Sequence, residues 1–260
     1  MKRTILASLV VLTLLFCGCS RKNPPVPPTQ TQPQAVTTED TLPAPQPTEP
    51  PAPEHSQFYI PGVPVEDVIL YFNEVCLDSE FINSGDPSLV QKWTVPISYV
   101  LQGDYTEMDE AIVITFEEWL KRVDGFPGIS PAESPDAWNL RICFCTAGEL
   151  VAIMGPDFEN MDGAVTFWYD NDEIYDGVIC CRTDLSQHLR NSVLLEELYN
   201  SLGPIQDTTL RPDSIIYQEY SENQWLSPMD ELILKLLYHP DILPGMNAAE
   251  CDQVIRSLYY

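Results

Sequence analysis

The sequence predicts one mixed α/β domain that follows a short leader and a proline-rich segment. Three observations predict this fold class. Residues 57–260 are long enough to form a single domain with a hydrophobic core. Within this range, short β-rich runs are intermixed with amphipathic helical runs. The last part of the chain carries helical patterns alone, so we expect a mixed, twisted sheet beside a helical C-terminal subdomain.

The predicted strands are β-rich or alternating runs bounded by turn residues. They cover residues 93–101, 139–145, 164–168 and 174–182. The acidic sequence 170–173 joins the last two strands. It lacks the glycine and the terminal glutamate of an EF-hand calcium loop. We therefore predict a solvated hairpin there, and a loop over residues 128–136.

The predicted helices show apolar residues at three- and four-residue spacing. They cover residues 106–125, 148–154, 185–202, 228–238 and 248–258. Asp109 stands three residues after Thr106, where it can complete a capping box. Gly203 and Pro204 end the third helix, because glycine is typical just after a helix and proline cannot continue it. That helix shows the clearest pattern in the chain.

The first residues resemble the leader of a bacterial lipoprotein. Two basic residues precede the apolar run 5–16, which is too short to span about 30 Å of hydrocarbon comfortably as a helix. The run ends in the letters FCGC, which resemble the lipobox and close with Cys19. The resemblance implies a signal peptide over residues 1–18 and a lipid on Cys19. We therefore expect the protein at the cell membrane, facing the extracytoplasmic side; an ordinary cleaved signal peptide and an uncleaved anchor are the alternatives.

Residues 19–56 are predicted to form a disordered tether. The segment 24–53 contains 11 prolines in 30 residues, interleaved with Thr, Gln, Ala and Glu. Such a composition cannot bury enough apolar surface to fold, and it favours extended polyproline II conformations. At about 3.1 Å per residue, the tether reaches on the order of 100 Å when fully extended. That length suits holding a domain away from a membrane.

The predicted domain is strongly acidic. Residues 57–260 hold 9 of the 13 basic residues and 35 of the 39 acidic ones, which gives a net charge of −26. Such a surface repels nucleic acid and anionic lipid headgroups, and it favours solubility or cationic partners. Nucleic-acid binding is therefore not expected.

Six cysteines fall within the predicted domain, and export would permit disulfides among them. They are Cys76, Cys143, Cys145, Cys180, Cys181 and Cys251. Six cysteines allow 15 pairings that the sequence does not distinguish. Neither close pair has the usual C-x₂-C spacing of a zinc site. Buried thiols, or one or two disulfides, are the expected arrangement.

Three polar residues lie opposite the apolar face of helix 185–202: Glu196, Glu197 and Asn200. Glu196 and Asn200 are four residues apart and point the same way. Asp207 follows in a turn that could bring it back beside them. These residues therefore form a candidate site, and the alternative is that they are the solvated face of an amphipathic helix.

Residues 196–207, EELYNSLGPIQD, resemble the metzincin motif H-E-x-x-H-x-x-G-x-x-H/D. In that motif two histidines and the final His or Asp hold zinc, and the glutamate activates water. The resemblance places Glu197 at the general base and Asp207 at the third ligand. It places Glu196 and Asn200 at the two histidine positions, and Ile216 at the methionine of the Met-turn.

The ending of this region looks like an uncharacterised bacterial family, the domain-of-unknown-function family 2927, which we regard as zincin-like. Leu237-Tyr238-His239-Pro240 and Pro244-Gly245-Met246 carry this resemblance. It covers residues 64–258 and is most specific over 193–246. It implies a zincin-like α/β (α+β) fold, a mixed twisted sheet with a long motif helix.

Loss of both motif histidines argues against zinc, which favours imidazole or thiolate ligands. An all-oxygen set suits a hard cation such as Ca²⁺ better. His188 is about 12 Å along the helix from Glu196, and His55 and His239 lie in other segments, so none replaces the lost pair. We therefore expect a non-catalytic, metzincin-like domain that binds a peptide, wall component or protein. A hydrolase using Glu197 as base with a non-standard metal site is the alternative, and a purely structural surface protein is the third possibility.

Overall fold

The computed structural model describes residues 56–77, 89–134, 136–218 and 222–260. The predicted signal peptide, Cys19 and nearly all of the tether lie outside the described residues, so those predictions stay predictions. Among the residues that are described, no helix is both long and apolar enough to cross a membrane.

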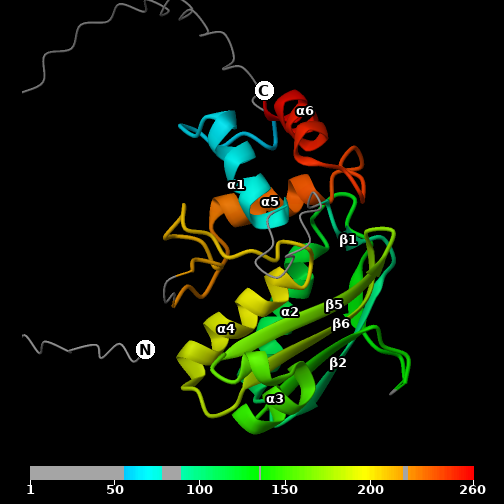
Figure 1. The fold of residues 1–260 in the computed structure, drawn as a ribbon, viewed down its shortest axis with the longest axis vertical. Coiled ribbons are helices and arrows are strands. Elements are labelled where there is room, and N and C mark those ends of the chain that lie inside the picture. The colour runs from blue at the N-terminus through cyan, green and yellow to red at the C-terminus, as the bar shows by residue number, and fades with distance from the viewer. Residues whose placement is uncertain (1–55, 78–88, 135, 219–221) are drawn as a thin grey trace, which may run out of the picture. The chain divides into compact units, whose positions relative to one another are not determined.

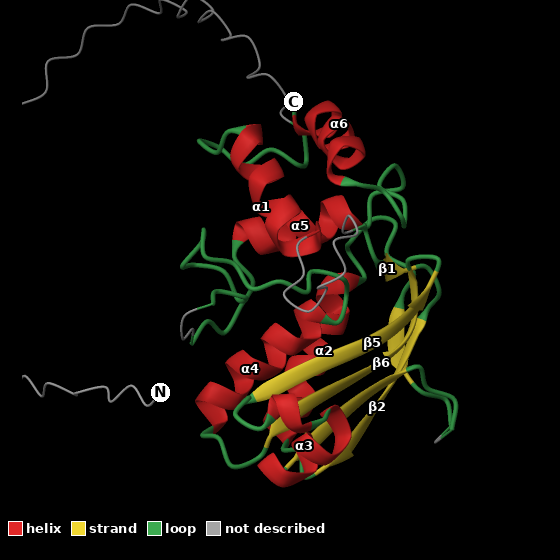
Figure 2. Ribbon diagram, in the orientation of Figure 1, coloured by secondary structure: helices red, strands yellow, loops and turns green. Residues whose placement is uncertain are grey.

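The centre of the domain is a six-stranded mixed sheet (Figure 2). Its strands are β1 (Lys92–Trp93), β2 (Ile97–Gly103), β3 (Ile129–Pro131), β4 (Leu140–Cys145), β5 (Gly163–Asp170) and β6 (Glu173–Arg182). The order is β1-β6-β4-β2-β3, with parallel pairing throughout. β5 runs antiparallel to β6 and pairs with no other strand of the described chain. β5 is therefore an antiparallel edge strand on an otherwise parallel sheet.

The described residues form six α-helices and one short 3₁₀-helix, some packed along the sheet and some gathered beyond one end of it (Figure 1). They are α1 (Val65–Leu77), α2 (Glu107–Leu120), α3 (Ala147–Met154), α4 (Gln187–Asn200), α5 (Pro228–Leu237), α6 (Ala248–Tyr259) and the 3₁₀-helix Pro156–Phe158. The predicted α/β class is confirmed. The zincin-like detail of that prediction stays open.

Alternate residues of the central strands contribute to two separate buried clusters. In β4, Ile142 and Phe144 belong to the main core, which also contains Leu194 of α4. Cys143 and Cys145 belong to a second cluster with Leu150 of α3. Because successive side chains of a strand point to opposite faces, α4 and α3 cover opposite faces of the sheet.

The helical subdomain is built from both ends of the described domain. α1 contacts α5 and α6, and Figure 1 shows the three helices gathered beyond the β1 end of the sheet. The subdomain was predicted to be purely C-terminal, with no element over residues 65–77, and α1 corrects that prediction. Tyr71 of α1 and Tyr199 of α4 are both fully buried and both donate to Asp230 of α5, so the core continues from the sheet into this part.

Local signals set several element boundaries as predicted. Thr106 and Asp109 form the predicted capping box of α2. Asn171 and Asp172 take positive φ angles of 50° and 63° in the two-residue turn between β5 and β6, which is the geometry of a tight hairpin. The predicted solvated hairpin is therefore confirmed.

The single strand predicted over residues 93–101 is two strands, β1 and β2, which pair with different neighbours. Three boundaries were also wrong. The region predicted as a loop over 128–136 contains the short strand β3, because Ile129 is buried beside Ile97 and pairs with it. The helix predicted to reach residue 125 ends as α2 at Leu120, and turns follow. The motif helix is shorter than 185–202 and spans Gln187–Asn200, followed by turn residues before Gly203.

Candidate functional site

The motif helix α4 lies beside the edge strand β5 (Figure 1). The helix begins after Ser186, whose side chain accepts a hydrogen bond from the Leu189 amide. Leu194 and Leu198 are buried in the main core and fix which side of the helix faces inward. The side of the helix that carries the polar motif residues is then directed toward β5.

A cavity of about 540 Å³ lies between α4 and β5. All four residues predicted for the candidate site line it: Glu196, Glu197, Asn200 and Asp207. The turn after α4 therefore returns Asp207 to the helix, as the motif spacing predicted. The structure brings these residues to one site, and their roles stay untested.

Glu197 and Asn200 are buried, each with 7% of its surface exposed. The alternative that they form a solvated helix face is therefore wrong for these two residues. The physical reason is β5, which covers this side of α4. Glu196 is partly exposed at the same cavity.

The site disfavours negative charge on its own glutamates. Burial raises the pKa of Glu196 to about 8, and the nearby charges of Asp207 and Asp162 raise it as well. Burial also raises the pKa of Glu197 well above its ordinary value, and Glu196 and Asp207 add to this effect. A cationic group placed in the cavity would reverse both shifts, because it would stabilise the carboxylates.

Asn200 offers an open hydrogen-bond acceptor. Its Oδ1 atom is buried and has no hydrogen-bond partner in the described structure. A buried amide oxygen left unpaired costs on the order of 1–3 kcal/mol. A ligand that donates a hydrogen bond at this point would remove that cost.

The turn that carries Asp207 depends on Gly203. This residue has a φ of 128°, and a Cβ there would lie 2.4 Å from the Gln91 carbonyl oxygen. Only glycine tolerates both the backbone angle and the contact. The amide of Gln206 then donates to the carbonyl of Val75 in α1 at 3.3 Å, which holds the returning segment.

The region at the Met-turn position is fixed by a buried polar network. Ser214 donates to Asp230 Oδ1 at 2.7 Å, and Tyr71 donates to the same atom at 2.9 Å. The Ile215 amide donates to the other carboxylate oxygen at 3.1 Å. Ile216 itself is fully buried in the main core. It therefore acts as a packing residue of the core.

Sequence reasoning missed the wall of the cavity opposite α4. This wall is made by β5 and the residues just before it: Phe158, Met161, Asp162, Gly163, Ala164, Val165, Thr166, Phe167 and Tyr169. The strand itself was predicted, but its pairing with β6 alone follows from long-range topology. Asp162 is the one acidic group in this wall, and no motif pointed to it.

The donor atoms do not fit a zinc ion. The cavity lining contains carboxylates and the side-chain amides of Gln91 and Asn200, but neither His188 nor His239, and zinc prefers nitrogen or sulfur ligands. Within the described ranges, no three or more His, Cys, Asp or Glu side chains are arranged to hold a metal ion. We therefore derive no metal-dependent step at this site.

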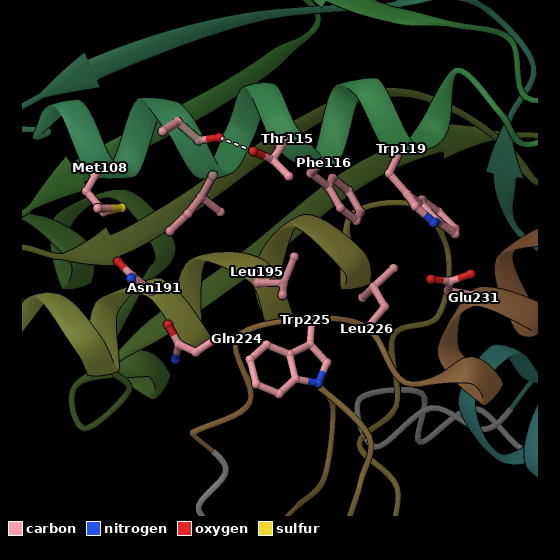
Figure 3. A pocket seen from close by; sticks show the side chains of 12 residues that line it. Met108, Thr115, Phe116, Trp119, Asn191, Leu195, Gln224, Trp225, Leu226 and Glu231 are labelled. Atoms are coloured by element: carbon pink, nitrogen blue, oxygen red, sulfur yellow. Dashed lines mark hydrogen bonds between the residues drawn. The ribbon is translucent and has the colours of Figure 1, made fainter. Parts of the chain in front are cut away.

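A second cavity, of about 410 Å³, lies between α2, α4 and the loop before α5 (Figure 3). Figure 3 shows Phe116 and Trp119 of α2 on one side and Trp225 and Leu226 of the loop on the other. Glu196, Glu197, Asn200 and Asp207 are all absent from its lining. It is therefore distinct from the candidate site.

The fold and site define a mixed α/β domain with a carboxylate-lined cavity between one helix and an edge strand. The sequence profile of the family described as "Protein of unknown function (DUF2927)" matches residues 66–257. The chain belongs to this family, as the resemblance predicted. No curated protein matches the chain.

Proposed function

We propose that this protein is a lipoprotein anchored through Cys19, whose domain binds an extracytoplasmic peptide, wall component or protein without cleaving it. One observation carries the binding proposal: Glu196, Glu197, Asn200 and Asp207 line a single cavity beside an edge strand. A helix that only filled the core would not need a buried, unpaired amide oxygen and a buried carboxyl at one cavity.

The edge strand supports binding of an extended segment. β5 pairs on one side with β6, and among the described strands none pairs with its other side. An edge of this kind presents unpaired backbone groups that an incoming chain can bind as an added strand. Side chains of such a ligand would enter the cavity between β5 and α4.

The charge of the cavity favours a ligand with cationic or hydrogen-bond-donating groups. The charge of Asp207 raises the pKa of both Glu196 and Glu197, and Asp162 also raises that of Glu196. The domain as a whole carries a net charge of −26. A lysine or amino group of a peptide would therefore be drawn to the site and stabilised there.

Non-catalytic binding is supported by the donor set. A zinc peptidase needs three protein ligands that leave an open position for water, and here Glu196 and Asn200 stand at both histidine positions. Burial also raises the pKa of Glu197, which favours the neutral carboxyl over the carboxylate that a general base needs. The leader sequence supports the anchoring part of the proposal, since it combines basic residues, an apolar run and a lipobox-like FCGC.

Photo-crosslinking in cells tests this proposal. A photoreactive phenylalanine replaces Tyr169, which lines the cavity, or Tyr175, which does not. The two tyrosines are matched, because they lie in the same hairpin and are 46% and 50% exposed. We expect an adduct with an envelope component at position 169 and none at position 175. Equal labelling at both positions, or none at 169, would overturn the proposal.

The competing function is hydrolysis with Glu197 as general base and a hard cation. The position of Glu197 in the cavity favours it. Elemental analysis of the purified full chain, together with cleavage of a peptide library by wild type and Glu197→Gln, separates the two. Stoichiometric metal with cleavage that depends on Glu197 would establish the hydrolase and contradict simple binding.

A further inference from the structure

Three cysteines meet on the face of the sheet opposite α4. Cys143 and Cys145 come from β4 and Cys180 from β6. All three are buried in a small cluster with Leu150 of α3. This cluster is separate from the proposed binding cavity, whose lining contains none of the three.

The strand register places Cys180 next to Cys143. The two residues are direct Cα partners in the parallel pair of β4 and β6. Neighbouring strands lie about 4.7–4.9 Å apart, and disulfides join Cα atoms about 4.4–6.8 Å apart. Cys145 is two residues further along β4 and therefore faces the same side. Interaction with the Cys180 thiol lowers the pKa of both Cys143 and Cys145, and all three are free thiols in the structure.

The adjacent Cys181 is excluded from this cluster by the strand alternation. Its side chain belongs to the main core on the other face, where its Sγ lies 3.9 Å from the Arg190 carbonyl oxygen of α4. Of the consecutive pair 180–181, only Cys180 can reach the cysteines of β4.

We propose that Cys180 and Cys143 form a disulfide in the exported protein, and that Cys145 is the alternative partner when Cys143 is removed. The oxidant is a disulfide, either a small molecule or a thiol–disulfide exchange protein. Its S–S bond breaks to give two thiols, and the S–S bond between Cys143 and Cys180 forms. Two electrons pass to the oxidant, and the two cysteine protons end on its thiols.

The order of steps follows from the cluster. The contacts of Cys180 with Cys143 and Cys145 raise the pKa of Cys180, so Cys143 is the first nucleophile. Its thiolate attacks one sulfur of the oxidant and releases the first oxidant thiol. Cys180 then attacks Cys143 Sγ and releases the second oxidant thiol, which takes up the Cys180 proton. The hydrogen bond from Cys180 lowers the pKa of Cys143 to about 7, and Arg141 contributes, so the thiolate is accessible near neutral pH. The cluster is reached by opening α3, which buries Leu150 alone.

Disulfide mapping of the full chain tests this inference. The detergent-extracted protein is equilibrated with oxidised glutathione, alkylated and digested with chymotrypsin, which cleaves after Phe144 and so separates Cys143 from Cys145. Mass spectrometry should find Cys143 joined to Cys180. In Cys143→Ser the partner should become Cys145, and Cys180→Ser should leave both β4 cysteines alkylated.

Cys181→Ala is the matched control and should keep the Cys143–Cys180 bond. Because this variant leaves one cysteine of the consecutive pair, it also shows that Cys180 is the bonded residue. Complete alkylation of Cys143 and Cys180 after oxidation would overturn the inference. A bond from Cys143 to any residue other than Cys180 would overturn it as well. Cys145→Ser keeps the test decisive if Cys180→Ser does not fold, because it should retain the wild-type bond.

Discussion

Gly163, the first residue of β5, lies directly against Glu197 of α4. A Cβ on residue 163 would be 2.7 Å from Glu197 Oε1 and 2.5 Å from Val193 Cγ1. The edge strand and the motif helix therefore approach as closely as they do only because residue 163 has no side chain. This approach is what buries Glu197 and closes one side of the cavity.

Replacing Gly163 with alanine should separate strand and helix. Overpacking of this kind typically costs about 1–3 kcal/mol of unfolding free energy, and the displaced Glu197 should weaken ligand crosslinking at Tyr169. Denaturant unfolding measures the first effect. Gly148→Ala is the control, because a Cβ there meets nothing within 4 Å and the residue is in α3. It should stabilise slightly.

Replacing Gly203 with alanine should disturb the turn that returns Asp207 to the site. The variant adds a strained φ, worth roughly 1–3 kcal/mol, and a contact of 2.4 Å with the Gln91 carbonyl oxygen. Gly128→Ala shares a positive φ of 106° but meets nothing within 4 Å. In thermal unfolding, the melting temperature of Gly203→Ala should therefore be well below that of Gly128→Ala. Equal melting temperatures would contradict a specific role for the close contact.

Replacing Arg190 with methionine should strongly destabilise the contact between α2 and α4. Arg190 Nε donates to Asp109 Oδ1 at 3.0 Å, and both residues are buried. Asp109 would then be a buried carboxylate without its cation, although Gln187 and Thr106 still donate to it, and the loss should be at most about 3–5 kcal/mol. In a double-mutant cycle, adding Asp109→Asn should recover part of the loss. Arg256→Met removes an exposed ion pair with Glu66 and should change stability little.

Stability should fall as pH rises through the range set by Glu196. Its pKa is raised from 4.5 to about 8 in the folded chain, so the folded state binds a proton that the unfolded state has lost between these values. The contribution of Glu196 to the unfolding free energy is then fully present below pH 4.5 and is lost as the pH rises to about 8, by at most about 1.4 kcal/mol per pH unit. Glu196→Gln should flatten the profile. A wild-type slope of zero or of opposite sign across this window would contradict the burial of Glu196.

Much of the fold followed from local signals. The capping box at Thr106, the hairpin turn at Asn171 and the glycine stop after α4 are short-range features, and they give nearly correct elements. Helix α1 was missed although its buried residues, such as Val68, Phe72 and Val75, have the spacing of a helix face. Strand β3 has only three residues and carries too little pattern to be recognised alone.

The candidate site was predictable only in part. The spacing of Glu196, Asn200 and Asp207 is a property of the sequence, so their approach was expected. The burial of Glu197 and Asn200 depends on β5, which meets α4 only after the sheet has formed. No local pattern encodes that contact. For this reason, the sequence of the helix was also compatible with a polar face exposed to solvent.

The central claim is that the cavity between α4 and β5 holds a ligand that it does not cut. The most direct measurement is the mass of the envelope component crosslinked at Tyr169 in otherwise wild-type protein and in Glu197→Gln. Binding without cleavage predicts the same ligand mass in both proteins. A shorter ligand in the wild type and an intact one in Glu197→Gln would show that Glu197 supports hydrolysis, and would contradict the claim.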